Sequence, residues 1–307
     1  MLYLVFIAAS MLSVYADTSV MFTDLPLRDQ RTLLVSTAFM DHIEVQPDLI
    51  MSDAWVSDYS QEHPTCSGYR FHRDKTVLTP RFQILYSVFS NVHGHKVVAI
   101  AGMHRPKHIE TVANFKPAKC PFEGECGRIH AGFLQAYLSF KEDLLQRFEK
   151  AKQITLVGHS MGAALALIAA YDFKRMGLPV TRVVAMGAPR IGTRQFEASF
   201  ERVMAETPVY RIILHGNQQR DFITRLPPRI LSYRSGSKRV ILDGTGLKRK
   251  YQIGVKDPSV NYIKDVEEDV AQNRFKMHSP DAYTYTMDAL IHRQMVEMGK
   301  FPSCVRI

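Results

Sequence analysis

The residue best suited to chemistry in this sequence is Ser160, which lies in a Gly-x-Ser-x-Gly pattern at residues 158–162. An aliphatic run, residues 154–157, precedes the pattern, and an Ala/Leu-rich segment follows it. This order is typical of a nucleophile elbow, in which the serine occupies a strained turn between a strand and a helix. Glycine is needed on both sides because a side chain would collide with the adjoining backbone. We therefore predict that Ser160 is a nucleophile.

A serine hydroxyl is a poor nucleophile at neutral pH, so Ser160 needs an imidazole to accept its proton and a carboxylate to orient that imidazole. Behind an elbow of this kind the partners follow in the order serine, acid, histidine. Asp221 follows a predicted strand, and His278 precedes the terminal helix. Chain order leaves other choices open, which are Asp243 and Asp257 for the acid and His215 and His292 for the base.

Strand-like and helix-like segments alternate around the elbow. Hydrophobic patterning predicts strands at residues 96–101, 154–157, 182–186 and 209–214, helices at 132–150 and 163–176, and a hairpin over 230–242 that turns at 235–237. This alternation implies right-handed crossovers and a largely parallel sheet, with the active site at the carboxyl ends of its strands. No repeat or linker divides the chain, so we predict a single α/β domain.

The composition indicates a globular protein with a large core. Of the 307 residues, 46% are hydrophobic, and the formal net charge is +9. The positive charge suits contact with anionic surfaces; the basic residues at 238–239 and 248–250 favour either acidic lipid or a solvated hairpin edge. No nucleic-acid-binding motif accompanies the charge, so we predict no nucleic-acid partner. The sequence does not indicate which oligomeric state the protein has.

The first residues resemble a targeting segment. Residues 2–12 are an apolar run with the length of a signal-peptide core, and Val14 and Ala16 place small residues before a cleavage point. The run is too short to span a bilayer. We predict a signal peptide at residues 1–16, a mature domain at 17–307 and secretion, against the alternative of a buried N-terminal helix or retained anchor.

The cysteines and histidines indicate disulfides rather than a metal. The sequence has four cysteines, which are Cys66, Cys120, Cys126 and Cys304. An even number suits an oxidising compartment, and no C-x-x-C pair forms a zinc knuckle. The spaced histidine pairs, His93 with His95 and His104 with His108, lack an H-E-x-x-H pattern, so we interpret them as solvated. We predict no metal and no cofactor.

Several ordered segments resemble the class 3 (fungal-type) lipases, and the resemblance covers most of the mature chain. Besides the elbow, the matching segments are residues 130–133 (HAGF, family H-x-G-F), 187–192 (GAPRIG, family G-x-P-R-[VI]-G) and 221–228 (DFITRLPP, family D-x-x-x-x-L-P-P). The family's catalytic histidine precedes a tyrosine, as His278 precedes Tyr283. The resemblance implies an α/β-hydrolase fold, with Asp221 as the acid and His278 as the base.

The segment that aligns with the family's oxyanion loop departs from its pattern. The family has F-R-G-[ST], whereas residues 100–103 read IAGM, so Met103 replaces the hydroxyl residue. The resemblance then leaves the backbone N–H groups of Met103 and Met161 to hold the oxyanion. Loss of one donor typically raises the barrier by about 3 kcal/mol.

The resemblance also suggests a lid and two disulfides. Residues 104–115 take the place of the family's lid, with Ile109, Val112 and Phe115 as its candidate apolar residues, although an ordinary surface helix is the alternative. Cys120 and Cys126 resemble a short disulfide found before H-x-G-F in some members. Cys304 matches the family's last cysteine, with Cys66 as a substitute partner.

Together these features predict a secreted serine ester hydrolase of the lipase type, which acts on acyl glycerides and makes peripheral contact with lipid surfaces. Phospholipase or feruloyl-type esterase activity on the same scaffold is the alternative within enzymes. An inactive lipid-binding or host-interaction protein is the alternative outside them, because Met103 removes a side-chain donor.

Overall fold

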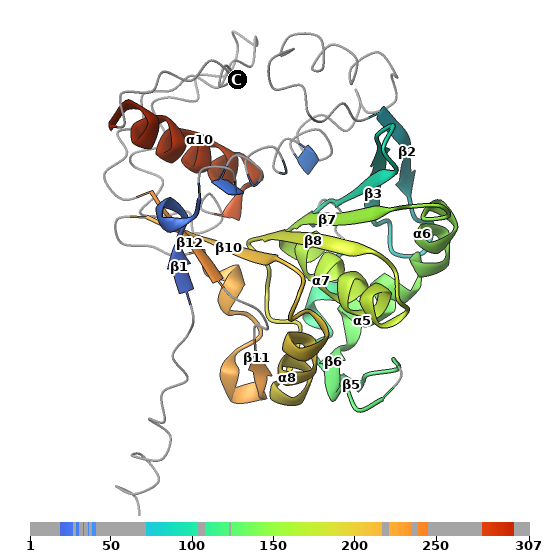
Figure 1. The fold of residues 1–307 in the computed structure, drawn as a ribbon. Helices are drawn as coiled ribbons and strands as arrows, with labels where there is room; N and C mark the ends of the chain where they lie inside the picture. The colour runs from blue at the N-terminus through green and yellow to red at the C-terminus, as the bar shows by residue number, and fades with distance from the viewer. Residues whose placement is uncertain are drawn as a thin grey trace, which may run out of the picture.

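A twisted sheet of eight strands forms the centre of the structure (Figure 1). The structure is a computed structural model that describes residues 19–26, 72–103, 108–122, 124–216, 221–234, 239–244 and 278–297, together with positions 29, 30, 33, 36, 39 and 40. In spatial order the strands are β1 (Ser19–Met21), β12 (Arg239–Asp243), β10 (Val209–His215), β8 (Val180–Met186), β7 (Gln153–His159), β4 (His95–Ile100), β3 (Leu85–Ser90) and β2 (His72–Leu78).

In this spatial order every neighbouring pair from β1 across to β4 is parallel. The pairs of β4 with β3 and of β3 with β2 are antiparallel. The carboxyl ends of β7, β8 and β10 therefore lie at the same edge. The prediction of a mostly parallel α/β sheet is confirmed. Residues 1–16 and 41–71 lie outside the described residues, so the predicted signal peptide and Cys66 cannot be placed.

Helices cover both faces of the sheet (Figure 1). One face packs on α7 (Ser160–Arg175), α5 (Ala131–Leu138), α6 (Lys141–Arg147) and α8 (Arg194–Val203), and the other on α10 (Pro280–Glu297) and the short η1 (Phe22–Asp24). All residues of α7 from Ser160 to Phe173 are buried. The small alanines of this helix allow it to approach β7 and β8 closely, which fixes the position of its first residue.

A second, smaller sheet lies beside the first. Its order is β11 (Tyr233–Arg234), β9 (Gly192–Thr193), β6 (Arg128–His130) and β5 (Pro117–Lys119), and all its pairs are antiparallel. The remaining short elements are α4 (His108–Ala113), η4 (Ile223–Arg225) and η5 (Arg229–Leu231). Among the described residues no helix is long and apolar enough to cross a bilayer.

The predicted continuous helix at residues 132–150 is wrong, because the structure has two helices there. The break lies at Ser139 and Phe140, where the Ser139 hydroxyl donates to the carbonyl of Ala136 at 2.6 Å. Phe140 leaves helical geometry and is buried, with its ring 5.3 Å from that of Tyr86. A local side-chain bond and a tertiary ring contact together outweigh the helical periodicity.

The predicted hairpin over residues 230–242 is also wrong. Tyr233 pairs with Thr193 in the small sheet, whereas Val240 pairs in parallel with Ile212 in the large one. Val240 and Leu242 are buried in the core under α10. Burial of Val240 and Leu242 against α10 therefore decides the pairing, rather than closeness along the chain.

Candidate active site

Ser160 occupies a strained turn directly after β7, at the first position of α7. Its φ of 55° is rare for a residue with a side chain. A Cβ on Gly158 would lie 2.4 Å from the carbonyl oxygen of Gly162, and a Cβ on Gly162 would lie 2.1 Å from that of Ile100. Both contacts are impossible, so the two glycines serve the purpose expected of them.

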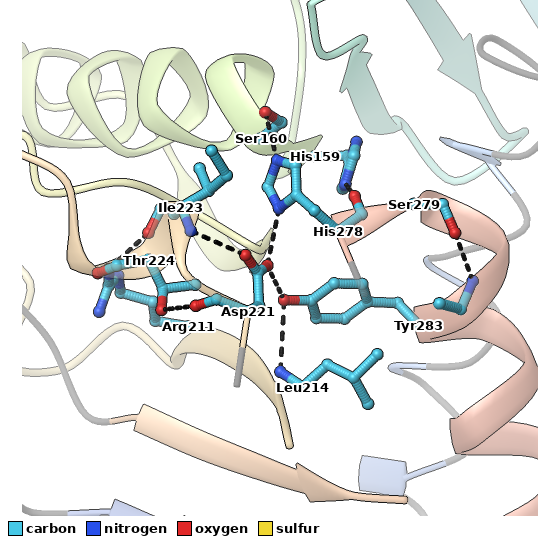
Figure 2. Close-up of polar contacts among 12 residues, drawn as sticks. His159, Ser160, Arg211, Leu214, Asp221, Ile223, Thr224, His278, Ser279 and Tyr283 are labelled. Carbon is cyan, nitrogen blue, oxygen red and sulfur yellow. Dashed lines mark hydrogen bonds and ion pairs between the residues drawn. The ribbon is translucent and has the colours of Figure 1, made fainter. Parts of the chain in front are cut away.

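Three side chains from distant parts of the chain meet at this turn (Figure 2). The Ser160 Oγ lies 2.6 Å from Nε2 of His278, and Nδ1 of the same ring lies 2.7 Å from Oδ2 of Asp221. All three residues are buried. A neutral His278 that donates from Nδ1 to the carboxylate presents its Nε2 lone pair to the serine hydroxyl, which is the arrangement a general base needs.

Asp221 is held by further donors. The backbone N–H of Ile223 donates to Oδ1 at 3.0 Å, and the hydroxyl of Tyr283 donates to Oδ2 at 2.5 Å. The Tyr283 oxygen in turn accepts the N–H of Leu214 at 3.3 Å (Figure 2). Burial and the neighbouring carboxylate raise the pKa of Tyr283 well above its ordinary value, so this hydroxyl remains a donor. The sequence places Tyr283 in a motif but does not indicate this bond.

The alternatives from chain order do not occupy this site. His215 and Asp243 are register partners at the ends of β10 and β12. Asp257 and the side chain of His292 lie outside the described residues. The structure therefore brings together Ser160, Asp221 and His278, which are the residues that the resemblance selected.

Two further residues contact His278, and the sequence did not predict these contacts. The ring of His159 contacts the His278 backbone, with Nε2 2.6 Å from the carbonyl oxygen, and the two ring centres are 4.8 Å apart. Gly187 has a φ of +60°, and a Cβ there would lie 2.9 Å from both Oδ2 of Asp221 and Cε1 of His278. In the sequence, His159 occupies the variable position before the serine of the elbow, and Gly187 is the first glycine of the GAPRIG segment. These positions are the features that could have indicated the two contacts.

Two buried arginines hold the segment that follows Asp221. Nη2 of Arg211 donates to the carbonyls of Ala188 and Thr224, the latter at 3.1 Å, and Nη1 of Arg190 donates to those of Arg225 and Pro227. Burial lowers the pKa of Arg211 to about 9, with Arg239 and Arg190 adding to this effect. Arg211 was detectable as a lone cation inside an aliphatic strand.

The segments that carry Met103 and Met161 lie against each other. Met161 is the second residue of α7 and is buried, whereas Met103 follows β4 and is exposed. Because Gly162 has no Cβ, the carbonyl groups of Ile100 and Ala101 can approach it closely. The loop after β4 therefore abuts the start of α7. This adjacency is what two backbone donors around one oxyanion require.

The predicted lid residues have different environments. Val112 packs against the core, whereas Ile109 and Phe115 are exposed. Ile109 and Val112 lie in α4, and Phe115 follows it. Side chains hold both ends of α4, because His108 Nε2 lies 2.9 Å from the carbonyl oxygen of Phe82 and His130 Nε2 lies 3.2 Å from that of Val112. Residues 104–107 lie outside the described residues.

The expectation of solvated histidines is wrong for two of them. His108 is fully buried, and His95 is half-buried with Nε2 2.8 Å from Oγ1 of Thr155. Carbonyl and hydroxyl partners make this burial possible. In the described part of the chain, no cluster of three His, Cys, Asp or Glu side chains is arranged to hold a metal ion.

Cys120 and Cys126 form a disulfide that closes a small loop before β6, with Cα atoms 5.7 Å apart. Backbone bonding supports the loop, since the N–H of Cys120 donates to the carbonyl of Gly127. Cys66 and Cys304 lie outside the described residues, so their pairing stays a prediction.

Comparison with known proteins finds a family model that matches part of the chain. Residues 97–231 match the family described as lipase (class 3). These residues, which make up less than half of the chain, are similar to class 3 lipases. The match includes Ser160 and Asp221, while His278 lies beyond it.

Individual curated relatives also match part of the chain. A secreted mono- and diacylglycerol lipase of Fusarium solani is 30% identical over 174 residues, which are 55% of this chain and 50% of the relative. A chloroplastic phospholipase A(1) of Arabidopsis thaliana is 35% identical over 122 residues, 34% of this chain and 26% of the relative. The chain thus spans half or less of the length of these curated relatives.

Solved structures share the fold. A nonglycosylated Yarrowia lipolytica lipase superposes with a TM-score of 0.57 at 17% identity, covering 71% of this chain and 81% of the other. A fungal lipase-inhibitor complex gives 0.55 at 20% identity, covering 70% and 80%. The α/β-hydrolase fold predicted from the sequence is confirmed.

Proposed function

We propose that this protein is a serine ester hydrolase that cleaves acyl glycerides through an acyl-enzyme. The observation that carries the proposal is the continuous contact from Ser160 Oγ through His278 to Asp221. The relatives named mono- and diacylglycerol lipases support glycerides as the substrate class.

The chemistry follows from these contacts. Ser160 Oγ attacks the ester carbonyl carbon as His278 Nε2 takes its proton, while Asp221 stabilises the resulting imidazolium. The backbone N–H groups of Met103 and Met161 receive the negative charge on the carbonyl oxygen. His278 then gives its proton to the departing alcohol, and a water molecule, activated in the same way, releases the fatty acid.

Covalent labelling tests the nucleophile. We expect a fluorophosphonate to label the wild-type protein and not Ser160→Ala. Ser199→Ala is the matched control, because Ser199 is a buried serine bonded to Tyr171 and lies outside the triad. An unlabelled wild type that unfolds cooperatively would contradict the proposal and favour the inactive lipid-binding or host-interaction alternative.

A substrate panel tests the class of ester. We expect release of fatty acid from emulsified mono-, di- and triacylglycerol to exceed release from phosphatidylcholine and from soluble short-chain or feruloyl esters. Similarity to plant phospholipases A(1) makes phosphatidylcholine the second candidate. A higher rate on phosphatidylcholine than on any glyceride would replace the proposed substrate, without affecting the proposed triad.

We also propose an extracellular destination, with residues 1–16 as the signal peptide and 17–307 as one domain. The Cys120–Cys126 disulfide and the relatives named as secreted lipases support it. N-terminal sequencing of protein from the culture medium is expected to begin at Asp17. Retention of the chain in cells would contradict the proposal.

A further inference from the structure

Exposed apolar side chains gather in the short segment between η4 and β11. Among the described residues ten large apolar side chains are exposed, and three of them, Leu226, Ile230 and Leu231, fall within six positions. Ile230 is the most exposed of the ten, at 89%. Clustering of this kind marks a surface that another apolar phase covers.

This segment borders the active site. It follows the turn that begins at Asp221, in which the Thr224 hydroxyl donates to the Asp221 carbonyl at 2.7 Å. At its other end, the hydroxyl of Tyr233 donates to the carbonyl of Phe115 at 2.8 Å. Phe115 is itself exposed and follows α4. The exposed residues thus link the segment after the candidate acid to the end of the predicted lid.

The stretch from the end of η4 to the start of β12, which includes this segment, is strongly basic. Every charged residue in 225–239 is a cation, namely Arg225, Arg229, Arg234, Lys238 and Arg239. Arg225 and Arg229 are exposed and flank Leu226. The neighbouring charges that lower the pKa of buried Arg190 to about 10, after burial itself, are all arginines: Arg229, Arg225, Arg234 and Arg239. The local field is therefore positive, and it reaches the protein surface.

We propose that Arg225, Arg229, Leu226, Ile230, Leu231 and Phe115, here called the basic rim, dock the protein on anionic lipid surfaces. Guanidinium groups bind phosphate oxygens at the headgroup level, while aliphatic side chains between them enter the acyl boundary. The proposal rests on the proposed function, because docking at this rim would bring an ester bond of the surface to Ser160. It adds a preference for negative charge, which hydrolysis of a neutral glyceride does not require.

Vesicle binding tests the rim apart from catalysis. The Ser160→Ala protein, which leaves the lipid intact, is mixed with sucrose-loaded vesicles of phosphatidylcholine alone or of equal parts phosphatidylcholine and phosphatidylglycerol, and the bound fraction is sedimented. On this background, Arg225→Gln with Arg229→Gln is expected to lower partition onto the anionic vesicles about thirty-fold, since each cation near such a surface contributes about five-fold. Partition onto phosphatidylcholine alone should not change. Ile230→Ser should lower partition onto both vesicles about ten-fold.

Matched controls come from the opposite edge of the sheet. Lys150 and Lys152 are exposed cations before β7, and Val92 is 85% exposed before β4. Lys150→Gln with Lys152→Gln, and Val92→Ser, should leave both partitions unchanged. An equal loss in the lysine pair would show that net charge alone drives binding and would overturn the proposal. So would a wild type without preference for phosphatidylglycerol, or rim variants that change the oligomeric state in light scattering instead.

Soluble short-chain ester hydrolysis separates this proposal from the proposed function. Rim variants made in the wild-type background should keep that activity, which also shows that they fold. Absence of hydrolysis in the wild type, together with rim-dependent binding to anionic vesicles, would refute the proposed function. The proposal that the basic rim docks the protein on anionic lipid would still hold.

Discussion

The hydroxyl of Tyr283 donates to Oδ2 of Asp221, the oxygen that also faces His278 (Figure 2). Tyr283 lies within α10, whereas Asp221 follows β10, so this bond joins the terminal helix to the end of a central strand. His278 lies just before the same helix. The contact therefore positions the imidazole and the carboxylate as one unit.

Removal of the Tyr283 hydroxyl should position Asp221 and His278 less well, while their own contact remains. Tyr283→Phe is expected to lower kcat for a soluble ester about ten-fold, since a hydrogen bond to a charged group contributes about 1.5–3 kcal/mol. KM should change little, because Tyr283 is buried and contacts Asp221 rather than Ser160. Tyr233→Phe, which removes another buried hydroxyl that bonds to a carbonyl, is the control. Equal rates in both variants would show that the Tyr283 bond has no part in positioning.

Gly187 should tolerate no side chain, for a reason that differs from backbone strain. Gly187→Ala places a methyl against His278 and Asp221, whereas Gly177→Ala has a similar φ of +78° and meets nothing within 4 Å. Gly177→Ala is expected to lose about 1 kcal/mol of unfolding free energy, measured in urea, because of its positive φ. Gly187→Ala should lose about 1–3 kcal/mol more, because its methyl also overpacks the buried site. Gly187→Ala alone should lose most of its ester hydrolysis. Comparable activity in the two variants would contradict the close packing described for the triad.

Arg211 should affect both stability and catalysis through the carbonyl groups to which it donates. Arg211→Met is expected to lower the free energy of unfolding by about 2 kcal/mol, because the buried Ala188 and Thr224 carbonyls lose their donor. It should also lower kcat, since Thr224 belongs to the turn after Asp221. Arg211→Lys retains the charge but not the planar fork, so its losses should be intermediate. The exposed Arg202→Met is the control; a fully stable and active Arg211→Met would refute this role.

His130 should make stability fall in mild acid. Burial lowers its pKa from 6.5 to about 4. Its contribution to stability is therefore complete above pH 6.5 and is lost as the pH falls towards 4, because only the unfolded chain takes up the proton. The loss reaches about 3 kcal/mol at pH 4. Urea unfolding across this range should show a shallower pH dependence in His130→Gln than in the wild type, and no change in His93→Gln, which alters an exposed ring.

Local sequence was sufficient where one segment determines its own shape. The Gly-x-Ser-x-Gly turn, the buried strand before it and the alanine-rich helix after it all follow from neighbouring residues, because the steric limits act within a few positions. The parallel sheet followed from the alternation of strands and helices. The family resemblance suggested the disulfide between Cys120 and Cys126, which the structure forms.

Tertiary structure decided whatever depends on contacts between distant segments. Chain order could not separate Asp221 from Asp243, or His278 from His215, until the ends of β7 and β10 and the start of α10 were brought to one place. The break at Ser139 and Phe140 and the separation of Tyr233 from Val240 depend on rings and strands far away in the sequence. The contacts of Tyr283, Gly187 and Arg211 with the site have the same origin, because hydrogen bonding and close packing act through space, whereas a sequence pattern records only what lies next along the chain.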